Sequence, residues 1–204
     1  MAVSFADARS LLTRPPVVYT LENVERIFYG TYTPKEREAL QDIPFSEDVL
    51  RACAGTHMLF PGYSLSLLEV RDDHADLFRS KTGGWYAEEK QAFSRASVPV
   101  RWHLLRMEPV PRSLNKTWSE QCKLLLSDEE VPSAATVAFA AMLHFKATEQ
   151  RLFEKCYVRT SDVDSDGRRV CVGDFDAGGF IVSSSGWDDD RYGGVLGLSA
   201  SRKF

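Results

Sequence analysis

The strongest pattern of hydrophobic and polar positions lies between residues 133 and 153. Ser133 is a favourable N-cap residue, and apolar residues follow it at helical spacing. One apolar stripe with two flanking residues comprises Ala134, Val137, Ala138, Ala141, Met142, Phe145, Phe139 and Leu143. A helix that is apolar over most of its circumference must be buried. The pattern therefore predicts a long helix, from Ser133 to Phe153, in the middle of the core.

From residue 156 onwards, short apolar runs alternate with turns rich in Asp and Gly. Four runs have the composition of strands, at 156–160, 170–175, 180–182 and 195–198. The order predicts an antiparallel β-meander. We expect the helix from Ser133 to Phe153 to lie across this sheet, because both elements have an apolar face that needs a partner.

Upstream of residue 133, helical spacing is broken into short segments. Helices are predicted at Phe5–Leu12, after Thr20 or Asn23, from Thr33 to about Gln41, after Ser46, from Ser64 or Ser66 through Leu77, and from Asn115 or Thr117 through Leu125. Strands are predicted at Met58–Phe60 and Val98–Met107. The whole chain is thus predicted to be a single α+β domain, residues 1–204, with residues 1–56 as a candidate small helical N-terminal lobe.

Composition narrows the class of protein. The 204 residues are 44% hydrophobic and 26% charged, which is typical of globular chains, and no apolar stretch is long enough for a membrane span. The first residues are too charged for a signal peptide, and the four cysteines contain no CxxC pair. We therefore expect reduced thiols and a cytoplasmic protein without a membrane partner. The net charge of −4 does not favour a general nucleic-acid binder.

The turn at residues 162–167, DVDSDG, matches the opening of a calcium-binding loop. The match then fails, because the twelfth position is Gly173 instead of Glu and the eighth is Arg169 instead of an apolar residue. Asp and Gly are also common in hairpin turns, so a plain turn is the alternative. If a metal binds, the candidate ligands of Ca²⁺ or Mg²⁺ are Asp162, Asp164, Asp166 and Asp174; otherwise we expect no cofactor.

Residues 79–116 carry eight basic and three acidic side chains, with aromatic residues interleaved. Basic residues beside stacking aromatics are typical of sites for anions or single-stranded nucleic acid. The candidate binding residues are Arg79, Lys81, Arg95, Arg101, Trp85 and Trp102. The alternative is that Trp102 belongs to the core and that the long basic side chains line an exposed strand.

Three phrases in the C-terminal half carry a resemblance: LRMEPVPRSLNKTWSEQ (105–121), RLFEKCYVRTSDVDSDGRRVCVGDFDAGG (151–179) and WDDDRYGGVLGLSASRK (187–203). They are similar to an uncharacterised family of bacterial proteins. The resemblance implies a bacterial, intracellular protein. Because that family has no established activity, the resemblance assigns no catalytic residue.

Three functions follow from these observations. The first is a non-enzymatic protein that binds another macromolecule or a second copy of itself, because common catalytic motifs are absent and Trp85, Tyr86 and Trp187 are candidate interface anchors. The second is a metal-dependent enzyme for a phosphate-containing substrate, which requires segments 162–176 and 79–116 to converge. The third is a nucleic-acid-binding module. Catalytic residues remain unknown, although His57, His74, His103 and His144 are candidates for acid–base roles.

Overall fold

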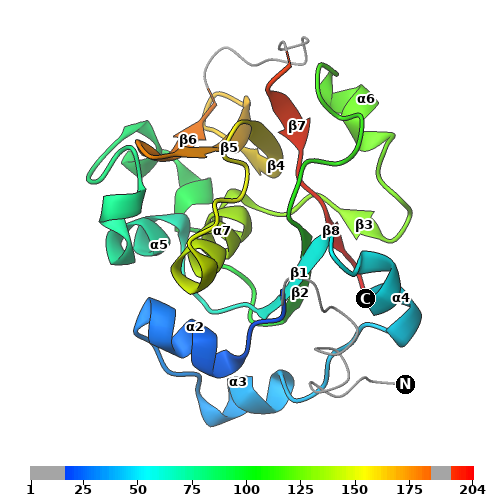
Figure 1. Cartoon of the computed structure of the whole chain (residues 1–204). Helices are drawn as coiled ribbons and strands as arrows, with labels where there is room; N and C mark the ends of the chain where they lie inside the picture. Colours follow the sequence, from blue (N-terminus) through cyan, green and yellow to red (C-terminus); the bar gives the residue numbers. More distant parts are fainter. Residues whose placement is uncertain (1–16, 185–193) are drawn as a thin grey trace.

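The computed structural model describes residues 17–184 and 194–204 and has the predicted α+β architecture. Two four-stranded sheets and several short helices surround helix α7 (Ala134–Thr148) (Figure 1). The predicted helix Phe5–Leu12, the aromatic residue Trp187 and the acidic run 188–190 lie outside the described residues. Within them, no helix reaches the length and apolarity that a membrane span requires.

The short helices begin where a Ser or Thr side chain caps the first turn. The capped helices are α2 (Leu21–Phe28), α3 (Pro34–Ala39), α4 (Glu47–Cys53), α5 (Leu67–Asp73) and α6 (Trp118–Cys122). Each cap oxygen accepts a hydrogen bond from a backbone N–H that the helix leaves unpaired. The helix predicted to continue through Leu77 ends earlier, at Asp73, and 3-10 turns follow at Ala75–Leu77, Trp85–Ala87 and Ala92–Arg95.

The larger sheet contains the predicted meander. Strands β4 (Tyr157–Val163), β5 (Arg169–Asp176) and β6 (Gly179–Ser183) pair antiparallel in that order. The fourth predicted strand, β7 (Leu196–Leu198), exists but does not extend the meander, because it pairs in parallel with β4 at the opposite edge. Residues 184–195 separate β6 from β7, and a connection of that length is what a parallel crossover needs.

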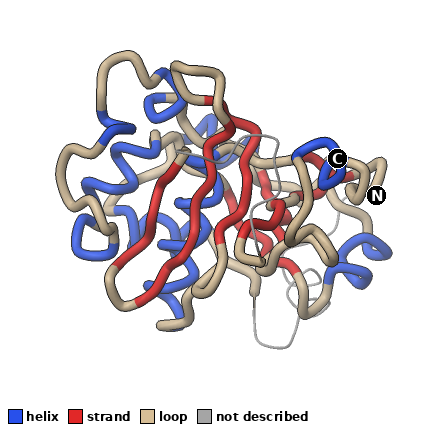
Figure 2. The backbone as a smooth tube through the Cα atoms, turned by 90° about the horizontal axis from the view of Figure 1, so that it is seen from above, coloured by secondary structure: helices blue, strands red, loops and turns tan. Residues whose placement is uncertain are grey.

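The smaller sheet has the order β1-β2-β8-β3. Its central pair is β1 (His57–Pro61) with β2 (Trp102–Arg106), and its short outer strands are β8 (Ser201–Arg202) and β3 (Glu129–Glu130). Figure 2 shows the three long strands of the larger sheet beside the shorter strands of the smaller one. Since β7 and β8 follow each other along the chain, the C-terminal segment joins the two sheets.

Helix α7 is the centre of the core. Every residue from Ala134 to His144 is buried, and α7 contacts β4 and β5 on one side and α2 and α5 on another. Phe139 stacks on Phe28 of α2, with ring centroids 4.2 Å apart. Residues of segment 17–56 belong to this same core cluster. The predicted packing of a long buried helix on the meander is confirmed, but the helix ends at Thr148 instead of Phe153, because Glu149 adopts a left-handed conformation.

Candidate functional site

The Asp-rich turn is held together by its own hydrogen bonds. The Asp164 carboxylate accepts from the backbone amides of Asp166 and Arg168, from Nε of Arg168 and from the hydroxyl of Ser184, at 2.7–3.0 Å. Burial alone would raise the pKa of Asp164, but these hydrogen bonds outweigh it and lower the pKa below its usual value. Asp166 pairs with the Arg168 guanidinium at 2.7 Å.

The other two candidate metal ligands also have protein partners. Asp162 Oδ2 accepts from the Ala134 amide at 2.6 Å, at the N-terminus of α7, and burial raises the pKa of this carboxyl. Asp174 Oδ2 accepts from the Tyr157 hydroxyl at 3.0 Å. In residues 17–184 and 194–204 there is no group of three or more His, Cys, Asp or Glu side chains placed to hold a metal ion. Metal binding at this turn remains a prediction.

The basic and acidic segments do touch each other. Arg79 donates to Asp176 at 3.2 Å and to the Gly178 carbonyl at 3.0 Å. Gln91 donates to the Ser165 hydroxyl and accepts from the Ser165 amide, at 3.1 and 3.0 Å. This contact neutralises the charge of Arg79 within the molecule. Where the two segments meet, Arg79 is therefore already paired and is not left free for an external anion.

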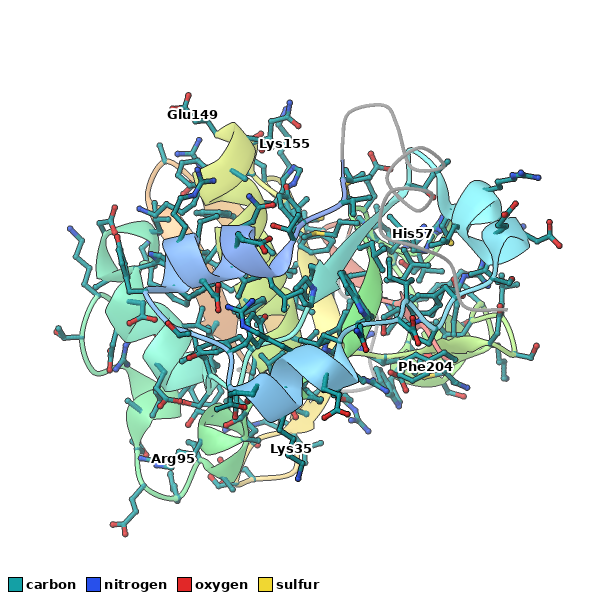
Figure 3. All side chains as sticks on the ribbon, turned by 90° about the horizontal axis from the view of Figure 1, so that it is seen from below. Lys35, His57, Arg95, Glu149, Lys155 and Phe204 are labelled. Atoms are coloured by element: carbon teal, nitrogen blue, oxygen red, sulfur yellow. The ribbon has the colours of Figure 1, made fainter. Side chains whose placement is uncertain are left out.

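The other candidate basic residues lie apart. Arg95 donates to three carbonyls of residues 87–91, and Arg101 pairs with Glu130 and lies over the Phe204 ring. Lys81 is exposed and makes no ion pair with any residue that the structure describes. Figure 3 shows Arg95 on one side of the molecule and Phe204, the ring beneath Arg101, on the other. Arg95 and Arg101 therefore do not belong to one patch.

The two tryptophans proposed as stacking residues pack in or against the hydrophobic core. Trp102 is 3% exposed and donates from Nε1 to the Leu40 carbonyl, at 3.0 Å. Trp85 packs against the core and donates from Nε1 to the Val182 carbonyl in β6, at 3.1 Å. The expectation that Tyr86 is an exposed anchor is wrong, because its ring is buried under Arg71. Binding of an anion by the predicted set remains a prediction.

A cleft of about 660 Å³ lies at the C-terminal end of α7. Its walls come from three segments that are distant in sequence: the turn before β1 at 55–56, the exit from β2 at 106–114, and the loop between α7 and β4 at 150–156. The first two segments adjoin the smaller sheet and the third leads into the larger one. The cleft therefore occupies the seam between the sheets. Its volume falls in the range of small-ligand sites.

Three arginines line this cleft: Arg106, Arg112 and Arg151. None of them forms an ion pair with a carboxylate of residues 17–184 or 194–204. The Arg151 guanidinium lies over two aromatic rings, 4.7 Å from the Phe145 centroid and 5.5 Å from the Phe175 centroid. An arginine held on aromatic faces keeps its fork of donors in a defined place, ready for a planar or tetrahedral oxyanion.

Two residues that line the cleft have left-handed backbones. Arg112 has a φ of 66° and Phe153 a φ of 54°. For residues with a Cβ, this conformation costs about 1–2 kcal/mol each, and it persists only where the surroundings hold it. The Phe153 carbonyl accepts from the amides of Cys156 and Phe175, which fixes the loop against β5. Strain of this kind is concentrated at functional sites.

His144 closes the cleft on the side of α7. Its Nδ1 lies 2.7 Å from the Tyr19 hydroxyl, and the residue is 3% exposed. Burial lowers the pKa of His144, opposed by a hydrogen bond to Gln150, so the ring is neutral at pH 7. If the Tyr19 hydroxyl donates to Nδ1, the remaining proton is on Nε2, the ring nitrogen that is left for the hydrogen bond with Gln150.

Two glutamates, Glu108 and Glu154, line the same cleft and are exposed. Next to them is the Cys156 thiol, whose pKa is raised to about 11 by burial and by the charges of Asp174 and Glu108. The thiol is therefore protonated at neutral pH and a weak nucleophile. The cleft thus combines three cationic, two anionic and several neutral polar groups with apolar walls.

A second, smaller pocket of about 190 Å³ adjoins the N-terminal end of α7. It is lined by His103, Ser133 and Thr136 among others. His103 is 4% exposed, its Nε2 lies 3.0 Å from the Pro99 carbonyl, and its ring stacks on Phe60. These contacts identify His103 as part of the interior.

Comparison with protein-family models, with curated proteins and with solved structures finds no match to this chain. Sequence reasoning placed Arg106 and Arg112 in the basic segment 79–116 but did not single them out, and it did not connect them with Arg151. A signal exists for Arg112 alone, which lies in the loop after the predicted strand Val98–Met107. Arg106 falls inside that predicted strand, and Arg151 falls inside the predicted helix from Ser133 to Phe153. Loops at element ends are where binding residues gather.

Proposed function

We propose that the protein is a non-enzymatic binding protein that holds an anionic group of its ligand in the arginine cleft. The observation that carries the proposal is the set of three arginines on one cleft without a carboxylate partner among the described residues. Arginine pairs with phosphate or carboxylate through two parallel hydrogen bonds, which are stronger than neutral ones. An anion that enters the cleft would replace solvent around three charges at once.

The size and lining of the cleft favour a small anionic group over a nucleic-acid strand. Single-stranded nucleic acid binds where exposed aromatic rings stack on its bases. The aromatic residue that lines the cleft, Phe153, is 4% exposed and so offers no such platform. The anionic group would belong to a small molecule or to the end of a partner macromolecule. The cytoplasmic location and a homo-oligomeric state remain expectations; sedimentation velocity of the purified chain tests the second.

Titration with inorganic phosphate and with acetate at low ionic strength, followed by calorimetry, tests the proposal. We expect saturable binding that Arg151→Gln and Arg112→Gln each weaken at least tenfold, because each variant removes a charge-assisted hydrogen bond. Lys155→Gln is the matched control: it removes the same charge beside the cleft, but Lys155 does not line it. Equal weakening in the control, or no saturable binding of either anion, would overturn the proposal. Arg112 is exposed, so its variant should fold normally.

The metal-dependent enzyme remains an alternative because Arg79 and Asp176 bring the basic and acidic segments into contact. A phosphate ester that is hydrolysed only with Mg²⁺, Mn²⁺ or Ca²⁺ present would favour it. For the nucleic-acid alternative, the discriminating measurement is the salt dependence of binding to a single-stranded oligonucleotide, since phosphate contacts weaken steeply as salt rises.

A further inference from the structure

We propose that the ligand of the arginine cleft is zwitterionic: a small phosphate ester that also carries an ammonium group. This inference rests on the proposed function and deepens it. The observation behind it is that the cleft offers two carboxylates, Glu108 and Glu154, alongside its three arginines.

The five charged side chains stay apart although they share one cleft. Among the described residues, none of them takes part in a salt bridge, with another of the five or with any other residue. Arg151 is held over Phe145 and Phe175, although Glu154 is only three residues away. Unpaired charges of both signs around one space suit a ligand that brings the complementary pair.

Both acidic groups belong to segments of the wall that adjoin Cys156. Glu108 lies close enough to Cys156 for its charge to act on the thiol, and Glu154 precedes Cys156 by two residues in the same loop. Asp174 also acts on this thiol, but its carboxylate already accepts from Tyr157. Glu108 and Glu154 are thus the carboxylates left to accept hydrogen bonds from a ligand. An ammonium group has three donors and no acceptor, which matches two such carboxylates.

The phosphate end has the stronger match with the arginines. A phosphate monoester offers three oxygen acceptors and about two negative charges at pH 7.5, against three guanidinium groups. A ligand with a single carboxylate would leave part of the positive charge of the three guanidinium groups without a partner. The cleft volume of about 660 Å³ is large enough to hold a free molecule of this class.

The test compares O-phosphoethanolamine with propyl phosphate, which has nearly the same shape but a methyl group in place of the ammonium. Calorimetry at pH 7.5 should give at least fivefold tighter binding of O-phosphoethanolamine. In Glu108→Gln and Glu154→Gln, this preference should fall towards one, while propyl phosphate binds as well as before or more tightly. Glu149→Gln is the matched control, since Glu149 is exposed at the end of α7 but does not line the cleft (Figure 3).

The outcomes separate the two proposals. Equal binding of both esters, unchanged in the glutamate variants, would overturn the zwitterionic ligand and leave the arginine cleft standing. No binding of either ester would overturn the proposed function itself. Sedimentation of the protein with vesicles of phosphatidylethanolamine and phosphatidylcholine, compared with phosphatidylcholine alone, distinguishes the sources. We expect the protein to sediment with neither kind of vesicle. Sedimentation only with the vesicles that contain phosphatidylethanolamine would overturn the proposal that the ligand is a free small molecule, and would favour a lipid headgroup.

Discussion

The two ends of helix α7 are both rich in charge, but the charged side chains are paired at one end and unpaired at the other. Beyond the N-terminal end, the acidic residues of the hairpin turn are bonded to amides, a hydroxyl and Arg168. At the C-terminal end, three arginines surround a cleft without carboxylate partners in the described chain. Density of charge along a sequence therefore does not identify a binding site. The site proposed here rests instead on charge that the fold leaves without a partner among the described residues.

The polarity of the helix favours this arrangement. A helix carries a partial positive charge at its N-terminus and a partial negative charge at its C-terminus. Asp162 accepts from the first turn of α7, and Arg151 follows its last turn. The helix thus stabilises each sign of charge where it is found. The aromatic rings of Phe145 and Phe175 add to this at the C-terminal end, so the cleft can keep Arg151 ready without an acidic partner.

Acid should have the largest effect on the comparison of the two ends, because it protonates the buried His103 near the N-terminal end of α7, whereas the cleft arginines stay charged throughout. Burial lowers the pKa of His103 from 6.5 to about 4. Between these values the unfolded chain binds a proton that the folded chain does not, so stability falls as pH falls. The shift corresponds to about 3 kcal/mol lost between pH 7 and pH 4. Urea unfolding at both pH values should show a smaller loss in His103→Gln; an equal loss would contradict the assignment.

Removal of the Asp164 charge should have the next largest effect. Its carboxylate is fully buried and accepts four hydrogen bonds: two from backbone amides, one from the charged Arg168 guanidinium and one from the Ser184 hydroxyl. Asp164→Asn is expected to lower the unfolding free energy by about 2 kcal/mol. The control Asp166→Asn, at an exposed position of the same turn, should cost much less. Urea unfolding at pH 7 measures the unfolding free energy of both variants. Similar losses of stability in the two would contradict the conclusion that the buried hydrogen bonds of Asp164 stabilise the turn.

The Asp164 variant also sharpens the metal prediction. An ion that binds only the folded state raises its stability by about 2.7 kcal/mol at a hundredfold excess over Kd. Because protein donors already occupy Asp164, we expect melts of chelator-stripped protein to be unchanged by Ca²⁺, Mg²⁺ or Mn²⁺. A rise with one ion, absent in Asp164→Asn, would instead establish a metal site at the turn.

The smallest effect, with the opposite sign, is expected for Asp162. Burial raises its pKa, so ionisation of this carboxyl costs stability as pH rises through its usual value. Asp162→Asn keeps an oxygen that can accept from Ala134 and removes the charge. It should leave stability at pH 7 unchanged or raise it by less than about 1 kcal/mol. Urea unfolding of this variant beside Asp164→Asn would show opposite signs, and losses of equal size would contradict the distinction.

Local signals were sufficient for most of the elements. The N-caps Thr33, Ser46 and Ser133 begin helices as predicted, and the apolar stripe of α7 is buried as its pattern requires. The partners of short strands were harder to predict. β3 and β8 have two residues each, too few for an alternation of apolar and polar residues to be visible in the sequence. The sequence of β7 did not indicate that it pairs in parallel with β4. His144, named from the sequence only as a candidate for an acid–base role, is 3% exposed, because Tyr19 and Gln150 of the loop after α7 contact its ring.

The sequence by itself determined the α+β class, the central helix and the meander, because helical spacing, caps and turns act over a few residues. Only the tertiary structure decided which charges stay unpaired. Arg79 forms an ion pair with Asp176, and Arg101 forms one with Glu130. Arg106, Arg112 and Arg151, in contrast, line one cleft between the two sheets. Pairing of charges depends on distances of a few ångströms between residues that are far apart in the chain, and the packing of the core sets those distances.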